Sequence, residues 1–186
     1  MTPASKRACA ILASAGSIAL ATATASAAAP ETASAQEDPC ARFSWNIERE
    51  RALFATSPQA LAAGRDAASG AQLVTDQLYE LQLAPQSQTS MVLPPGKKSA
   101  AEGAYAGLAR LRIQQAGSYR ISLNQPAWID LADEGRMIDS ADFQGRPGCA
   151  APHKIVQYSL PGGHEFVLQL SAALDPRIRI TITRVP

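Results

Sequence analysis

Hydrophobic and polar residues alternate one by one along much of the chain beyond residue 75. The apolar positions of the clearest runs are Tyr79, Leu81 and Leu83; Ala109, Leu111 and Ile113; Tyr119, Ile121 and Leu123; Phe166, Leu168 and Leu170; and Ile178, Ile180 and Ile182. A period of two places successive side chains on opposite faces of a strand, so that one face is buried and the other meets water. The pattern predicts half-buried antiparallel β-strands.

Turn-forming residues separate these runs at short intervals. Clusters rich in Gly, Pro, Asp or Gln occur at residues 94–98, 114–117, 133–135, 145–148, 161–163 and 174–176. Short strands with turn signals between them are typical of all-β sandwiches and barrels. We therefore expect residues 76–186 to form an antiparallel, jelly-roll-like β-sandwich of about seven or eight strands.

The preceding segment, residues 36–75, lacks a sustained period. Alternation at residues 43–47 favours a short strand that runs into a short helical turn over residues 48–54. A helix that begins at Ser44 as its N-cap is the alternative. Residues 56–72 hold many Ala and Gly and are expected to form a long exposed connection. The whole segment is expected to dock on the sandwich as part of one domain.

The beginning of the chain has the layout of a secretory signal peptide. Two basic residues precede the uncharged run 8–21, and small-x-small cleavage sites follow at residues 25–27 and 33–35. The apolar run is too short and too rich in Ala for a membrane-spanning helix, which needs about 20 strongly apolar residues. We interpret residues 1–35 as a leader and expect a periplasmic or secreted protein without an integral membrane segment after cleavage.

Charge argues against some classes of partner. The full chain has 17 basic and 16 acidic residues, and removing residues 1–35 leaves 15 of each. A protein with no net charge has no global field to attract nucleic acid or an anionic membrane surface. Nucleic-acid binding is therefore not expected.

Two cysteines remain after the leader, Cys40 and Cys149. An even number of cysteines in an exported chain favours a disulfide, and two unpaired buried thiols are the alternative. A structural metal site is disfavoured because two isolated cysteines supply too few soft ligands.

Two stretches of the core resemble a known family. AGSYRISLNQPAWIDL at residues 116–131 and YSLPGGHEFVLQLSA at residues 158–172 are similar to the small secreted β-sandwich modules of the bacterial pre-peptidase C-terminal type. The likeness covers residues 109–185 and consists of elements shared by many jelly-roll sandwiches. It implies a non-catalytic accessory or binding module, with bound calcium in some members. The sequence departs from the family pattern because no protease domain accompanies the module.

Acidic residues are concentrated between the predicted strand at 127–131 and the second cysteine. Asp130, Asp133, Asp139 and Asp142 are the candidate ligands for a calcium ion, which takes six to eight oxygen ligands. No EF-hand spacing is present. The alternative is that these residues are solvated turn formers, since Asp and Glu followed by Gly at 133–135 compose a tight hairpin turn.

Trp128 is a candidate binding residue. On a strand through residues 127–131 it shares a face with Asp130, opposite the apolar residues 129 and 131. An exposed Trp on a sheet could stack on a sugar or anchor a protein partner. Alternatively, it packs on a second layer of the sandwich or on the disulfide.

Arginines also alternate with core positions. Arg110, Arg112 and Arg120 would form a basic stripe for an anionic polymer or an acidic partner if their strands were neighbours. The alternative is a set of Arg side chains paired with acidic residues across strands.

Catalytic signatures are missing from the sequence. It contains neither HExxH nor Gly-x-Ser-x-Gly, and its histidines are His153 and His164, each beside a predicted turn. We therefore expect an exported, non-catalytic binding or accessory protein of the cell envelope, with an envelope polymer or a protein as its partner. The alternative is a secreted hydrolase or a calcium-dependent protein that uses the Asp130–Asp142 region with His153.

Overall fold

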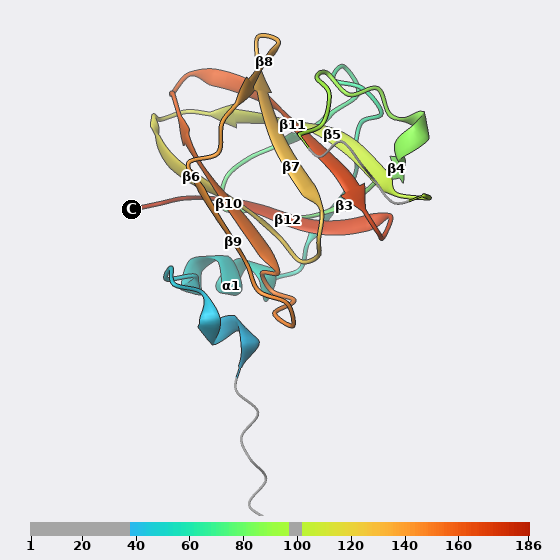
Figure 1. Ribbon diagram of the computed structural model, residues 1–186. Coiled ribbons are helices and arrows are strands. Elements are labelled where there is room, and N and C mark those ends of the chain that lie inside the picture. Colours follow the sequence, from blue (N-terminus) through green and yellow to red (C-terminus); the bar gives the residue numbers. More distant parts are fainter. Residues whose placement is uncertain (1–37, 97–101) are drawn as a thin grey trace, which may run out of the picture. The chain divides into compact units, whose positions relative to one another are not determined.

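The computed structural model describes residues 38–96 and 102–186, and the predicted leader, residues 1–35, lies outside these ranges. The alternating runs fold into two β-sheets that enclose one hydrophobic core between them (Figure 1). The described residues therefore form an all-β sandwich, which confirms the predicted fold class. None of their helices is long and apolar enough to cross a membrane.

The first sheet, sheet A, is the one that contains the last strand of the chain. Its spatial order is β1 (Gln59–Ala62), β3 (Leu78–Gln82), β12 (Arg177–Arg184), β6 (Gly117–Leu123), β10 (Lys154–Leu160) and β9 (Asp142–Gly145). All neighbours are antiparallel except β1 and β3, which run parallel. The strand β12 lies inside the sheet, between β3 and β6.

The second sheet, sheet B, has its two longest strands side by side. Its spatial order is β2 (Ala71–Leu73), β5 (Tyr105–Ile113), β11 (His164–Ala173), β7 (Trp128–Asp133) and β8 (Arg136–Ile138), and the short β4 (Ala84–Pro85) also pairs with β5. Here the parallel pair is β2 and β5. The β7–β8 hairpin turns at Glu134 and Gly135, both with positive φ, as the predicted Asp-Glu-Gly turn requires.

The prediction of a long exposed connection at residues 56–72 was wrong. These residues contain all of β1 and the beginning of β2, each of which lies at an edge of its sheet. A strand of three or four residues at an edge shows too few alternations to be recognised, and β1 is mostly exposed on both faces. Both pairings are parallel, so the sheets are mixed and not purely antiparallel.

The core is built by the apolar positions of the alternating runs. Ile121 and Ile180 point inward from sheet A, and Leu111, Leu131 and Leu168 point inward from sheet B, all without measurable solvent exposure. Burying one such side chain contributes about 1.5–3 kcal/mol, so this interface between the sheets dominates the stability of the fold.

The N-terminal segment covers part of the outer face of sheet A. It contains the short 3-10 helix η1 (Pro39–Arg42) and the helix α1 (Glu48–Phe54), which packs against β12. The predicted helical turn is confirmed, but residues 43–47 between these helices do not form the predicted strand. Phe43 and Ile47 instead pack on Ile155, an outward residue of β10, and form a small second core.

A disulfide joins this segment to the rest of the domain. Cys40 in η1 is bonded to Cys149, which is buried beside the second core. The bond confirms the predicted pairing. It joins the beginning of the domain to the loop between β9 and β10. The other contacts that hold the N-terminal segment on the domain are the small second core and hydrogen bonds.

Residues 89–96, which follow the 3-10 helix η2 (Gln86–Gln88), cross the outer face of sheet B. The buried side chain of Gln169 on β11 accepts the N–H groups of Val92 at 2.6 Å and Leu93 at 3.1 Å, and its Nε2 donates to the carbonyl of Leu93 at 3.2 Å. A buried amide is costly unless its donors and acceptors are paired, and here the crossing segment pairs them.

Tyr158 on β10 connects the two sheets through the core. Its hydroxyl donates to the carbonyl of Ile129 on β7 at 3.1 Å. Burial, and in second place the negative charge of Asp130, raise the pKa of Tyr158 above its ordinary value. The folded protein therefore holds this phenol proton more tightly than the unfolded chain does.

We expect Tyr158→Phe to change how stability depends on alkaline pH. At neutral pH the variant should be about 1 kcal/mol less stable because the hydrogen bond is lost. Above pH 10 the unfolded wild-type chain loses the phenol proton and the folded one keeps it, so wild-type stability should fall by about 1.4 kcal/mol by about pH 11. Urea denaturation of both proteins at neutral pH and at about pH 11 measures the difference in their free energies of unfolding. If this difference is the same at both pH values, the raised pKa of Tyr158 is contradicted.

Candidate functional site

Trp128, at the start of β7, is held in a fixed orientation although its side chain is 37% exposed. Its Nε1 donates to one carboxylate oxygen of Asp130 at 2.8 Å. The other oxygen accepts the N–H of Gly96 at 3.1 Å. Asp130 is itself only 7% exposed, so a buried carboxylate links the indole by hydrogen bonds to the segment that crosses sheet B. An aromatic side chain fixed in this way loses little entropy when it binds a ligand.

Lys154, the first residue of β10, brings a positive charge to the same indole. Its Nζ lies 5.0 Å from the centre of the Trp128 ring and donates to the carbonyl of Ala127 at 2.9 Å. A cation over the face of an indole is attracted by the negative face of the ring. Strands of both sheets therefore contribute to the surroundings of Trp128.

Phe143 projects from the edge strand β9 and is 67% exposed. A hollow of about 380 Å³ is lined by both aromatic side chains, Trp128 and Phe143, together with Pro126, His153, Lys154 and Ala172. A second hollow of about 130 Å³ shares Trp128, Phe143 and Lys154 and adds Ser140. We call the two hollows together the aromatic groove. Their size matches the lower range of small-ligand sites.

The four candidate calcium ligands do not come together. Asp130 is engaged as described above, Asp133 contacts His164 Nδ1 at 3.2 Å, and Asp142 accepts the N–H of its neighbour Phe143 at 2.7 Å. Asp139 is exposed at the end of β8. Within residues 38–96 and 102–186, no three His, Cys, Asp or Glu side chains are grouped so that they could hold a metal ion.

The candidate arginines lie on two different sheets. Arg110 and Arg112 belong to β5 of sheet B, and Arg110 Nε donates to the carbonyl of Gly70 at 3.0 Å. Arg120 belongs to β6 of sheet A, where its guanidinium lies 4.6 Å from the centre of the Trp45 ring. The strands β5 and β6 are not neighbours in either sheet, so the condition for one basic stripe is not met.

His153, which the sequence analysis named as part of an alternative catalytic site, lines the aromatic groove together with Trp128. The histidine that contacts a carboxylate in the described residues is His164, at the opposite end of the strands. A general base needs a partner that orients it and a nucleophile within hydrogen-bond reach. Among the described residues, no hydrogen bond joins the His153 ring to such a partner.

Phe143 and Lys154 were missed in the sequence. Phe143 stands among acidic and polar residues at 139–145, and an isolated aromatic in such a stretch is a signal for an exposed contact residue. Lys154 gave no signal, because its side chain meets Trp128 only when β10 of sheet A lies beside β7 of sheet B in the folded sandwich.

Neither a protein-family model nor a curated protein sequence matches the chain. A proposal for its function therefore has to begin from the aromatic groove and from the leader that the sequence predicts.

Proposed function

We propose that the chain is an exported, non-catalytic binding module of the cell envelope that holds saccharide units of an envelope polymer in the aromatic groove. Export is supported by the predicted leader at residues 1–35, which lies outside the described residues, and by the Cys40–Cys149 bond. The signal peptide and the disulfide together favour the periplasm or the exterior as the location.

The observation that carries the proposal is a fixed and exposed Trp128 beside an open hollow. Phe143 also lines this hollow, and no ring contact joins the two side chains among the described residues. A pyranose ring has a flat apolar face that stacks on an indole, while its hydroxyl groups need polar partners at the rim. Lys154 and His153 supply such partners, and Ser140 supplies a hydroxyl.

Saccharide stacking would explain why hydrogen bonds hold the indole of Trp128 in one orientation. The hydrogen bonds from Trp128 to Asp130 and from Gly96 to Asp130 fix the ring without a ligand, so the cost of ordering it is met during folding. A Trp that served only as a cover for the sheet would be buried further and would not face a cavity.

We expect Trp128→Ala and Phe143→Ala each to weaken binding to polysaccharide by about tenfold or more, as truncation of a central aromatic contact does. Retention on insoluble peptidoglycan sacculi and on immobilised acidic and neutral exopolysaccharides measures this. Val92→Ala, which changes an apolar side chain of 38% exposure outside the groove, is the matched control. Phe143 is so exposed that its removal should leave the fold intact, which keeps the test valid if Trp128→Ala is unstable.

Fluorescence provides a second readout. The chain has two tryptophans, so Trp45→Phe leaves Trp128 as the sole reporter. A saccharide that covers the indole should shift its emission to shorter wavelength in a saturable manner. The proposal fails if no polysaccharide is retained by the wild-type protein, or if the two groove variants bind as the control does.

A further inference from the structure

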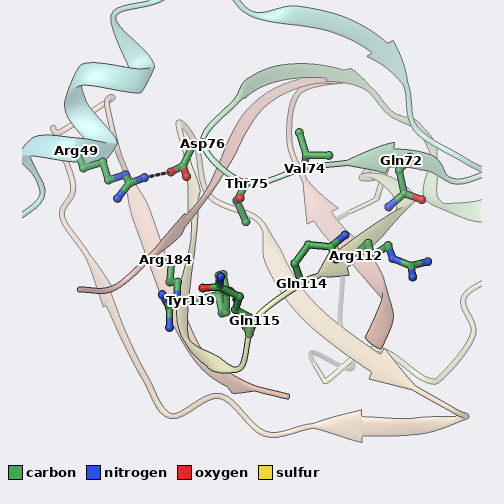
Figure 2. Close-up of a pocket in the computed structure, with 10 residues that line it drawn as sticks. All are labelled: Arg49, Gln72, Val74, Thr75, Asp76, Arg112, Gln114, Gln115, Tyr119 and Arg184. Carbon is green, nitrogen blue, oxygen red and sulfur yellow. Dashed lines mark hydrogen bonds and ion pairs between the residues drawn. The ribbon is translucent and has the colours of Figure 1, made fainter. Parts of the chain in front are cut away.

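A larger hollow, of about 450 Å³, lies at another place in the sandwich and was not anticipated from the sequence. Its wall is formed by α1, by the end of β2 and the loop after it, by the β5–β6 turn and by the last residue of β12 (Figure 2). Arg49, Arg112 and Arg184 contribute the basic side chains, so we call it the arginine pocket.

The arginine pocket and the aromatic groove lie at opposite ends of the strands. In sheet A, Arg184 is paired with Tyr119 near the start of β6, and both line the arginine pocket. Lys154 is paired with Leu123 at the end of β6, and Lys154 lines the groove. A ligand in one hollow therefore does not contact the residues of the other, and the two can be tested independently.

One guanidinium is oriented by the single carboxylate of the pocket. Asp76 lies 2.7 Å from Arg49 Nη2, and Figure 2 shows this ion pair on one side of the hollow. Asp76 has a φ of 62°, a left-handed conformation that Asp tolerates, and its N–H donates to the carbonyl of Ile182 at 2.8 Å. The backbone thus places the carboxylate where it pairs with Arg49 in the wall of the pocket.

Among the described residues, the other two guanidiniums form no ion pair with a carboxylate. Arg184 Nη2 donates to the carbonyl of Ala116 at 3.1 Å. This hydrogen bond orients the side chain, but a carbonyl does not balance the positive charge of the guanidinium. Arg112, on the other side of the hollow in Figure 2, is exposed and has no hydrogen-bond or ion-pair partner among the described residues. The lining of the pocket contains three guanidiniums and the carboxylate of Asp76, and Glu165 stands opposite Arg112 on β11 without an ion pair between them among the described residues.

The remaining wall suits a polar ligand with some apolar surface. Thr75 and Gln114 lie between Arg49 and Arg112 in the view of Figure 2 and offer a hydroxyl and an amide. Val74, which is 53% exposed, and the ring of Tyr119 form the apolar part.

We propose that the arginine pocket binds an anionic ligand that carries two or more carboxylate or phosphate groups. Guanidinium groups match the geometry of both anions through paired N–H donors, and cations on two sides of the hollow suit an extended ligand with more than one negative group. This proposal goes beyond the saccharide-binding function and does not depend on it.

The test is titration calorimetry of the disulfide-bonded protein with citrate, with inorganic triphosphate and with neutral maltotriose. We expect saturable binding of citrate or triphosphate with a Kd below about 1 mM, weakened by added salt, and none of maltotriose at this site. The stronger of the two anions identifies the carboxylate or the phosphate as the preferred group.

Three variants test both the direction and the size of the expected changes in affinity. Arg112→Gln and Arg184→Gln should each weaken binding by about tenfold or more, because each removes a charge-assisted hydrogen bond. Asp76→Asn should strengthen binding severalfold, since it removes the carboxylate that lines the pocket, and Asn tolerates the left-handed backbone. Arg177→Gln, at the other end of β12, is the matched control and should bind as the wild type does.

The outcomes are decisive in both directions. Weaker binding in the two arginine variants together with tighter binding in Asp76→Asn supports the proposal. If neither citrate nor triphosphate binds, or if the double variant of Arg112 and Arg184 binds as the control does, the proposal is overturned. Loss of polysaccharide retention in the Trp128 variant bears only on the aromatic groove and leaves this result unaffected.

Discussion

Loss of the Cys40–Cys149 disulfide is expected to lower the free energy of unfolding by about 4–5 kcal/mol in the chain-entropy description. The bond closes a loop with a sequence separation of 109 residues, so the unfolded chain gains much freedom when it is opened. The melting temperature should fall by about 10 °C or more for a domain of this size. The N-terminal segment should become the first part of the domain to exchange its amide hydrogens.

The double variant Cys40→Ala, Cys149→Ala separates this effect from others. Alanine suits the site because Cys149 is buried beside Phe43 and Ile155, where a new hydroxyl would lack partners. Urea denaturation with and without reductant should show a loss for the wild type and no further change for the variant. A loss below about 1 kcal/mol would mean that packing alone holds the N-terminal segment.

Arg120→Ala is expected to destabilise the fold by about 3–5 kcal/mol, because it leaves a buried charge without its partner. The carboxylate of Glu50 on α1 is 2% exposed, accepts the hydroxyl proton of Thr183 at 2.8 Å and lies 3.6 Å from Arg120 Nη1. Arg120 also donates to the carbonyl of Asn46 at 2.8 Å and covers the Trp45 ring. These contacts fix α1 and the chain before it on the outer face of sheet A.

A paired variant shows whether the unpaired charge is the cause. In Arg120→Met, Glu50→Gln both charges are absent and the volumes are similar, so much of the lost stability should return. Chemical denaturation of Arg120→Met, of Glu50→Gln and of the double variant gives the coupling between the two positions. If the double variant is as unstable as Arg120→Ala, the lost packing on Trp45 outweighs the ion pair.

The strands were predictable wherever a run was long enough to show its period. The runs that contain Leu111, Ile121, Leu168 and Ile180 became β5, β6, β11 and β12, because each buries one face against the opposite sheet. The helix over Glu48–Phe54 was also predicted, although a helix of seven residues is stable only through its packing.

The pairing of strands was not predictable in the same way. Alternation tells which residues face inward, but it does not tell which strand lies beside which. Arg110 and Arg120 have the same pattern of neighbours in the sequence, yet they occupy different sheets. The parallel edge strands β1 and β2 join partners far along the chain, and no turn signal marks such a pairing.

The candidate site was predicted in part for a related reason. Trp128 shares a face with Asp130 by strand parity, and the structure adds the hydrogen bond between them. The arginine pocket could not be predicted, since Arg49, Asp76, Arg112 and Arg184 come from separate elements and meet only after the sheets close. Local sequence therefore identified single residues, and the topology decided which of them share a cavity.

The interior position of β12 has a consequence for how the chain acquires its structure. Until Arg177–Arg184 inserts between β3 and β6, sheet A consists of two halves that share no backbone hydrogen bonds. The two halves of sheet A can therefore join only after residues 177–184 have been synthesised, so the strands on either side of β12 remain without their interior neighbour until then.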